Sequence, residues 1–277
     1  MEFHRFDEPG KVKLANISEE PPDGISKQKA KERIEELSGE IFELQDWMWG
    51  ARTHALLIVL QGRDAAGKDG AVKHMSGALN PRGVVVTSFG VPTEEEREHD
   101  FLWRVHRQAP RAGRVGIFNR SHYEDVLVAR VKELAPKPVW KERYGLINGF
   151  ERTLAAANTI ILKFFLHISK DEQKERLLAR EKDPAGAWKL SVEDWKERQL
   201  WDGFTEAYED AIGRCASADA PWIVVPANSK WYRDLVVVEA VAEALRPHRK
   251  EWRKTLDDQG KVLRKDVQEW RKHTDDP

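Results

Sequence analysis

A glycine-rich segment is the first feature of the sequence that could do chemistry. Residues Gly62-Arg63-Asp64-Ala65-Ala66-Gly67-Lys68 follow the apolar run 55–60 and precede a segment of helical character. A glycine, four residues, a second glycine and a lysine form the P-loop pattern. In that pattern, backbone N–H groups surround a phosphate at a helix N-terminus and the lysine reaches the outer phosphates. The spacing therefore predicts a phosphate-binding loop and phosphoryl transfer, with an ordinary glycine turn as the alternative.

Two acidic residues distinguish this loop from most P-loops. Asp69 stands where a serine or threonine commonly ligates Mg²⁺, and Asp64 lies inside the loop itself. A carboxylate beside phosphate groups is unfavourable unless a cation lies between them. We therefore expect Asp64 to ligate Mg²⁺, and the alternative is an Asx turn that stabilises the loop.

A second group of polar residues follows the predicted strand 114–118, in the sequence Asn119-Arg120-Ser121-His122-Tyr123-Glu124-Asp125. Ligands gather at the carboxyl ends of parallel strands, so this segment should lie beside the P-loop. Arg120 offers two parallel donors to a phosphate. Glu124 is either an acid near the metal or the first residue of the next helix, where acids are favoured.

A basic helix-turn-helix segment between residues 170 and 200 is predicted to form a lid. Pro184 and Gly186 interrupt two helical patterns, and the first of these patterns is rich in lysine and arginine. A lid can bring cations over a transferring phosphoryl group and exclude water. We expect this role for Arg180, and also for Arg130 on the helix after the second motif, whereas Lys174 is expected to serve only solvation.

The elements that must position these residues alternate between strand and helix patterns. Apolar runs at 55–60, 84–89, 115–118, 160–166 and 222–225 are separated by helical segments, which predicts an α/β fold with a parallel sheet. Capping patterns at Thr93, Ser169 and Ser191 mark three helix starts. An apolar stripe from Ala30 to Met48 predicts a helix that faces either the core or a second subunit.

The rest of the chain suggests one domain with appendages. We expect an N-terminal arm over residues 1–24, a phosphotransferase domain over 25–247 and a helical tail over 248–277. The net charge of −1 marks no general nucleic-acid or membrane-surface binder, so any basic site must be local. Cys215 is the only cysteine, and no signal peptide or membrane-spanning run is recognisable, so we expect a cytoplasmic protein without a disulfide.

Four blocks of sequence resemble the family 2 polyphosphate kinases, over about residues 34–245. The blocks are residues 60–70, Asn80-Pro81-Arg82-Gly83, residues 116–126 and Lys182-Asp183-Pro184 before Trp188-Lys189. The resemblance implies a three-layer α/β/α kinase fold, similar to thymidylate kinase, with a helical lid. It also implies Mg²⁺-dependent transfer of a terminal phosphoryl group between inorganic polyphosphate and a nucleotide, with Mn²⁺ as an alternative cation.

The resemblance also assigns roles to individual residues. Phosphate contacts are expected from the loop, the turn after it and the lid, namely Gly62, Arg63, Ala65, Ala66, Gly67, Lys68, Asp69, Gly70 and Lys182. Asp64 is expected to coordinate the metal, together with Asn119, which replaces the aspartate of many relatives. Arg120, Arg130 and Arg180 should line the polyphosphate path, and Glu124 suggests the subgroup that phosphorylates both AMP and ADP. The partners would be polyphosphate and adenine or guanine nucleotides, without nucleic acid or membrane, in a homo-oligomer.

Three other functions share parts of this pattern. The first is a P-loop kinase that uses ATP as its donor, the second is a nucleotide-binding regulator without catalysis, and the third is a nucleic-acid kinase. A P-loop lysine is expected to be exposed and to serve the ligand. The sequence therefore predicts that Lys68→Ala abolishes transfer and leaves the fold intact.

Overall fold

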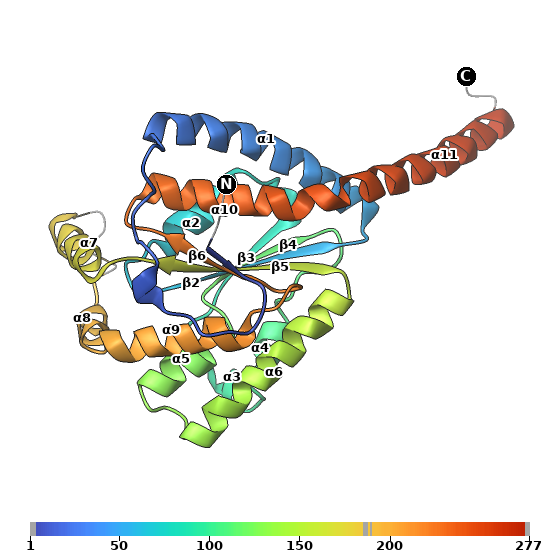
Figure 1. Ribbon diagram of the computed structural model, residues 1–277. Helices are drawn as coiled ribbons and strands as arrows, with labels where there is room; N and C mark the ends of the chain where they lie inside the picture. The colour runs from blue at the N-terminus through green and yellow to red at the C-terminus, as the bar shows by residue number, and fades with distance from the viewer. Residues whose placement is uncertain (1–3, 185–187, 189, 275–277) are drawn as a thin grey trace.

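A six-stranded sheet forms the centre of the computed structural model, which describes residues 4–184, 188 and 190–274 (Figure 1). The strand order is β1-β6-β5-β2-β4-β3, and only β1 runs antiparallel to its neighbour. The strands are β1 (His4–Phe6), β2 (Ala55–Gly62), β3 (Val84–Ser88), β4 (Val115–Asn119), β5 (Thr159–His167) and β6 (Trp222–Pro226). The five parallel strands coincide with the five predicted apolar runs, and the parallel α/β prediction is confirmed.

Helices cover both faces of the sheet (Figure 1). One face carries α1 (Lys27–Ala51), α2 (Lys68–Gly77) and α10 (Lys230–Leu245), and the other carries α5 (Glu124–Val131), α6 (Lys137–Ala156) and α9 (Trp201–Cys215). Because side chains alternate along a strand, Leu56 and Ile58 of β2 pack into the first layer and Leu57 and Val59 into the second. The central strand β2 is buried along its whole length, which holds the loop that follows it in a fixed place.

The apolar stripe of α1 faces the core of its own chain. Leu37, Ile41 and Met48 have no exposed surface and belong to the cluster that includes α10. An ion pair of 2.6 Å between Arg33 of α1 and Glu239 of α10 reinforces this packing. The stripe therefore does not present a surface for a second subunit.

The described part of the N-terminal arm also packs on the same chain. β1 adds an antiparallel edge strand to β6, and Val12, Leu14 and Ile17 are buried in the layer that contains α9. The backbone N–H of Asn228 donates to the carbonyl of Glu19. The arm thus covers one edge of the sheet, an edge that would otherwise expose unpaired backbone groups.

The lid consists of α7 (Lys170–Lys182) and α8 (Val192–Gln199) at the carboxyl ends of the strands (Figure 1). Ser169 and Ser191 accept hydrogen bonds from the first turns of these helices, and Thr93 forms a capping box at α3 (Glu94–Arg97). The three predicted helix starts are confirmed. Of the predicted turn between the lid helices, residues 185–187 and 189 lie outside the described residues.

The C-terminal segment begins with the short 3₁₀ helix η4 (Arg246–His248) and continues as α11 (Arg249–Thr274), which projects from the domain (Figure 1). Trp252 at the start of α11 is fully buried, whereas Leu263, Val267 and Trp270 are exposed. No helix among the described residues is long and apolar enough to cross a membrane.

A buried charged network lies between β5 and the helices beneath it. The ammonium of Lys163 donates to Glu151 at 2.6 Å, to the Tyr123 hydroxyl at 3.0 Å and to the carbonyl of Cys215 at 2.6 Å. Nε2 of His122 lies 3.1 Å from Oε1 of Glu151, the carboxylate oxygen that Lys163 does not contact. Two residues of the second sequence motif, His122 and Tyr123, therefore anchor the turn after β4 to the core.

Candidate active site

The backbone of the P-loop has the conformation that a phosphate cradle requires. Gly67 has a φ of 101° and Ala65 a φ of 61°, in the region that favours glycine and strains other residues. A Cβ on Gly67 would collide with the guanidinium of Arg233. Gly67, the N-cap residue of α2, has no side chain with which to cap the helix, so the first N–H groups of this helix are directed at the loop. The loop therefore offers backbone donors to an anion.

Lys68 is buried, and the expectation that it is exposed is wrong. Its ammonium donates to the carbonyls of Gly62 at 2.7 Å and of Arg63 at 3.0 Å. Burial lowers the pKa of Lys68, although the charge of Asp64 opposes this shift. The lysine thus closes the loop on itself, which sequence spacing does not reveal because it depends on side-chain direction.

Asp64 and Arg120 meet across the loop. Arg120 follows the last residue of β4 with a φ of 60°, and its guanidinium lies 2.8 Å from a carboxylate oxygen of Asp64 and 3.9 Å from one of Glu124. Burial raises the pKa of Glu124, against the opposing charges of Arg120 and Lys68. The structure therefore brings together four predicted site residues: Asp64, Lys68, Arg120 and Glu124.

The lid contributes carboxylates that the sequence interpretation missed. Burial and a hydrogen bond with Asp64 raise the pKa of Glu197 to about 7. Burial alone would also raise the pKa of Asp64, but Lys68, the bond from Glu197 and Arg120 together lower it. Asp194, three residues before Glu197 and thus on the same side of α8, pairs with Arg180 at 2.7 Å. The three-residue spacing of Asp194 and Glu197 is the sequence signal for this pair of acids, but it does not show that they face the P-loop.

Asn119, predicted as a metal ligand, donates its amide to Asp69 at 2.9 Å. Both side chains line the main cavity at the carboxyl ends of the strands. Together they connect the end of β4 to the first turn of α2, beside the phosphate cradle.

Of three other predicted residues, Arg130 and Lys182 lie outside this arrangement, whereas Arg63 borders it. Arg130 pairs with Asp210 of α9 at 2.6 Å and lines neither cavity described here, and Lys182 at the end of α7 is exposed. Arg63 stacks on Trp201 with 3.7 Å to the ring centroid, and burial lowers its pKa to about 10. The guanidinium of Arg63 donates to the Thr205 hydroxyl of α9. Arg63 also lines a smaller cavity of about 30 Å³, together with Asp64, Arg120, Glu124 and Glu197.

Two arginines hold the P-loop from outside. Arg176 of α7 donates to the carbonyls of Ala65 and Ala66 at 3.0 Å each, and Arg233 of α10 donates to that of Gly67 at 3.0 Å. Arg176 belongs to the basic lid cluster seen in the sequence, but Arg233 carries no local pattern that could have identified it. Both side chains line the main cavity with Lys68 and so place positive charge around the cradle.

The main cavity, of about 1050 Å³, carries a local positive charge. Its described lining includes six basic side chains, Lys68, Arg120, Arg176, Arg180, Lys230 and Arg233, and four acidic ones, Asp64, Asp69, Asp183 and Asp194. Six minus four gives a formal charge of +2 in a chain whose net charge is −1. A cavity of this size and charge suits a polyanionic ligand.

Comparison with known proteins gives one consistent result. Residues 24–253 match the family described as polyphosphate kinase 2 (PPK2). The chain is 48% identical over 250 residues to the AMP/ADP-polyphosphate phosphotransferase of Meiothermus ruber, covering 88% of this chain and 92% of that protein. It is 43% identical to the ADP-polyphosphate phosphotransferase of Rhodopseudomonas palustris, covering 77% and 76% of the two chains.

A solved structure agrees with these matches. The crystal structure of polyphosphate kinase 2 from Arthrobacter aurescens TC1 aligns with a TM-score of 0.83 at 41% identity, over 89% of this chain and 91% of that one. The fold, the P-loop and the extent of the match all agree with the resemblance carried by the four sequence blocks. The chain therefore belongs to the polyphosphate kinase 2 family.

Proposed function

We propose that this enzyme transfers the terminal phosphoryl group of inorganic polyphosphate to AMP and to ADP, making ADP and ATP in a reaction that is reversible in principle. The observation that carries the proposal is the P-loop cradle, which opens into a cavity with a formal charge of +2. The relative from Meiothermus ruber, named as acting on both AMP and ADP, supports the choice of acceptors.

A divalent cation fits beside the loop. Asp64 and Glu197 line the same small cavity, and burial together with the nearby Asp64 raises the pKa of Glu197 to about 7. Two carboxyl groups this close share a proton or bind a cation, because two bare carboxylates repel each other. Mg²⁺ prefers such oxygen ligands, and Mn²⁺ is the alternative. When bound, the cation would neutralise phosphate oxygens during transfer.

The residues of the chain would position the reacting groups. The N–H groups of residues 62–70 and Lys68 would hold the phosphates, and Arg120 would exchange Asp64 for an oxygen of the transferring group. Arg180 would likewise leave Asp194 as the lid closes over the site. The acceptor phosphate is already anionic, so in-line attack requires no general base, and positioning and charge neutralisation supply the catalysis.

The remaining assignments stay predictions. Asn119 is proposed as a further metal ligand, Glu124 as an acid that orients Arg120, and Arg130 and Lys182 as contacts for the outer polyphosphate chain. We also propose that the enzyme uses guanine nucleotides, lies in the cytoplasm and forms a homo-oligomer. Parallel assays with GMP and GDP, and sedimentation analysis, would measure the first and the last.

A time course with polyphosphate as the only donor tests the proposal. Purified enzyme, Mg²⁺, polyphosphate and AMP are sampled, and AMP, ADP and ATP are separated by chromatography. We expect ADP to appear first and ATP to follow. A parallel reaction replaces polyphosphate with ATP and offers other phosphate acceptors. If phosphorylation occurs only with ATP, the enzyme is an ATP-dependent kinase and the proposal is wrong.

A further inference from the structure

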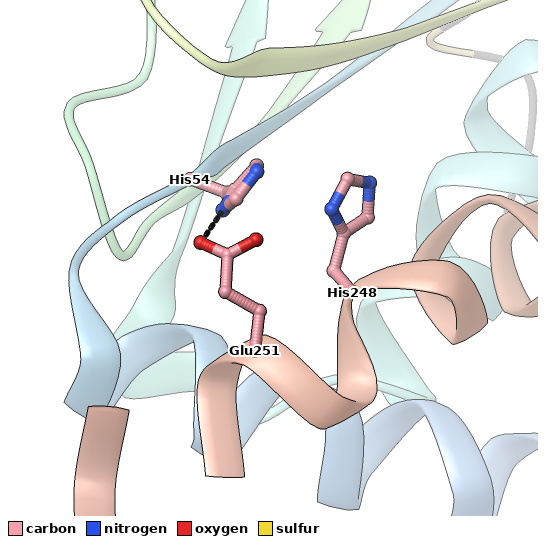
Figure 2. A group of neighbouring side chains, drawn as sticks. All are labelled: His54, His248 and Glu251. Atoms are coloured by element: carbon pink, nitrogen blue, oxygen red, sulfur yellow. Dashed lines mark ion pairs between the residues drawn. The ribbon is translucent and has the colours of Figure 1, made fainter. Parts of the chain in front are cut away.

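Three side chains converge at the amino-terminal end of the central strand β2, the end opposite the P-loop. His54 precedes β2, His248 ends η4 and Glu251 lies in the first turn of α11. Figure 2 shows the three side chains grouped together, with the carboxylate of Glu251 next to the imidazole of His54, and one potential ligand atom from each residue lies within 4.8 Å of the other two. No other group of three such side chains lies this close together in the described part of the chain.

The hydrogen bonding of His54 determines what it presents to this group. The indole N–H of Trp252, which can only donate, lies 3.1 Å from Nδ1 of His54, and the Thr53 hydroxyl lies 3.0 Å from the same atom. Nδ1 therefore carries a lone pair and no proton. The same atom lies 3.9 Å from a carboxylate oxygen of Glu251, the contact dashed in Figure 2. A cation between Nδ1 and this carboxylate would bind both of them, in competition with the donors that already contact Nδ1.

We propose that His54, His248 and Glu251 form a binding site for a transition-metal ion of the Zn²⁺ class. Two imidazoles and one carboxylate are a common zinc ligand set, with a fourth position left for water. His248 and Glu251 are three residues apart at the start of a helix and so share one side of it. A tetrahedral ion with bonds of about 2.1 Å sets ligand atoms about 3.4 Å apart. Binding would therefore draw the 3.9 Å contact between His54 and Glu251 in by about 0.5 Å, and a separation of 4.8 Å, the upper limit within the group, by about 1.4 Å.

The burial of the three ligands also suits a metal. His54 is buried, His248 is partly buried, and the side chain of Glu251 is 56% exposed. The site is therefore anchored on its inner side and open to solvent on its outer side, which provides a path for the ion to enter. An ion bound at Nδ1 of His54 would displace the Trp252 N–H from this lone pair.

The proposed site is separate from the phosphate cradle. His54 and the P-loop lie at opposite ends of β2, whose eight residues span about 26 Å at the usual rise of a strand. The ion would join the start of α11 to the central strand. Its expected effect is on the stability of this junction and not on phosphoryl transfer.

Zinc binding by the full chain tests the proposal. Equilibrium dialysis with Zn²⁺ is carried out in excess Mg²⁺, which occupies oxygen-ligand sites near the P-loop. Wild-type enzyme is compared with His248→Ala and Glu251→Gln, and with His99→Ala as a control that removes an exposed histidine elsewhere. We expect one Zn²⁺ per wild-type and control chain, and affinity at least tenfold weaker in both site variants.

Two further measurements distinguish this site from adventitious binding. Zn²⁺ should raise the melting temperature of the wild type and of His99→Ala but not that of His248→Ala. Co²⁺ should give the intense visible absorption of a four-coordinate site, and this absorption should be lost in Glu251→Gln. Trp252→Phe, which removes the competing donor, should bind Zn²⁺ at least as tightly as the wild type. Equal affinity in the wild type and both site variants would overturn the proposal.

Discussion

Replacement of Lys68 by alanine tests the two roles that the structure gives this residue. The ammonium donates to the carbonyls of Gly62 and Arg63 and also balances the charge of Asp64. A lost bond to a charged donor costs about 1.5–3 kcal/mol. In large domains each kcal/mol of lost stability lowers the melting temperature by about 2–4 °C. Lys68→Ala should therefore lower the melting temperature by about 3–12 °C.

The effect on phosphoryl transfer should be much larger than the effect on stability. A cation that neutralises a transferring phosphoryl group contributes about 10³–10⁵ to the rate, which corresponds to about 4–7 kcal/mol. We therefore expect the turnover of AMP with polyphosphate to fall at least about 1000-fold. The chromatographic time course measures this loss, and calorimetry measures the melting temperature of the same preparation.

Lys73 provides the matched control because it is exposed on the same helix α2. Lys73→Ala should retain the turnover and the melting temperature of the wild type. If Lys68→Ala turned over within tenfold of this control, Lys68 would not serve the transferred group, and the central claim about the P-loop would be refuted. An unchanged melting temperature would refute only the structural role of its two hydrogen bonds.

Three other predictions concern the buried network, the cysteine and the lid. Lys163→Met leaves the carboxylate of Glu151 without its cation and should destabilise the fold by about 3–5 kcal/mol in calorimetry, with part of the loss recovered when Glu151→Gln is added. Burial would raise the pKa of Glu151, but Lys163 and His122 outweigh this effect and lower it. The ionised Glu151 therefore stabilises the fold above the carboxyl pKa of the unfolded chain. This stabilisation is lost as the pH falls through the lower pKa of the folded state. The double variant should therefore show a weaker dependence of melting temperature on acid. Cys215 is buried with a pKa raised to about 12, and iodoacetamide at pH 8 should label it only after denaturation. Arg180→Ala should lower turnover about 10²- to 10³-fold without loss of helix content in circular dichroism, and turnover equal to the wild type would remove Arg180 from the proposed mechanism.

The strands that could be predicted are those whose own side chains carry the signal. The five parallel strands are buried on both faces and therefore read as continuous apolar runs. Among the described residues β1 spans His4–Phe6, and its pairing with β6 depends on backbone groups of a segment more than 200 residues away. No local pattern in the arm indicates such a partner. The sequence therefore predicted the parallel core of the sheet but not the edge strand that completes it.

The site residues divide in the same way. Gly67 and Asp64 could be located because the P-loop pattern depends on spacing along one segment. The partners of those residues come from other segments, as with Glu197 on the lid and Arg233 on α10. The buried position of Lys68 was likewise hidden, because the spacing of a motif says nothing of where a flexible side chain turns.

The charges of the site also suggest how it responds to its ligand. Arg120 is held by Asp64 and Arg180 by Asp194, so two of the cations proposed to contact phosphate already have carboxylate partners. A polyanion must replace these carboxylates, and the carboxylates in turn become available to a cation. Binding of polyphosphate and of the divalent ion should therefore be mutually favourable. Because Asp194 lies on α8, the same exchange changes what the lid contacts, which links occupancy of the cradle to the position of the lid.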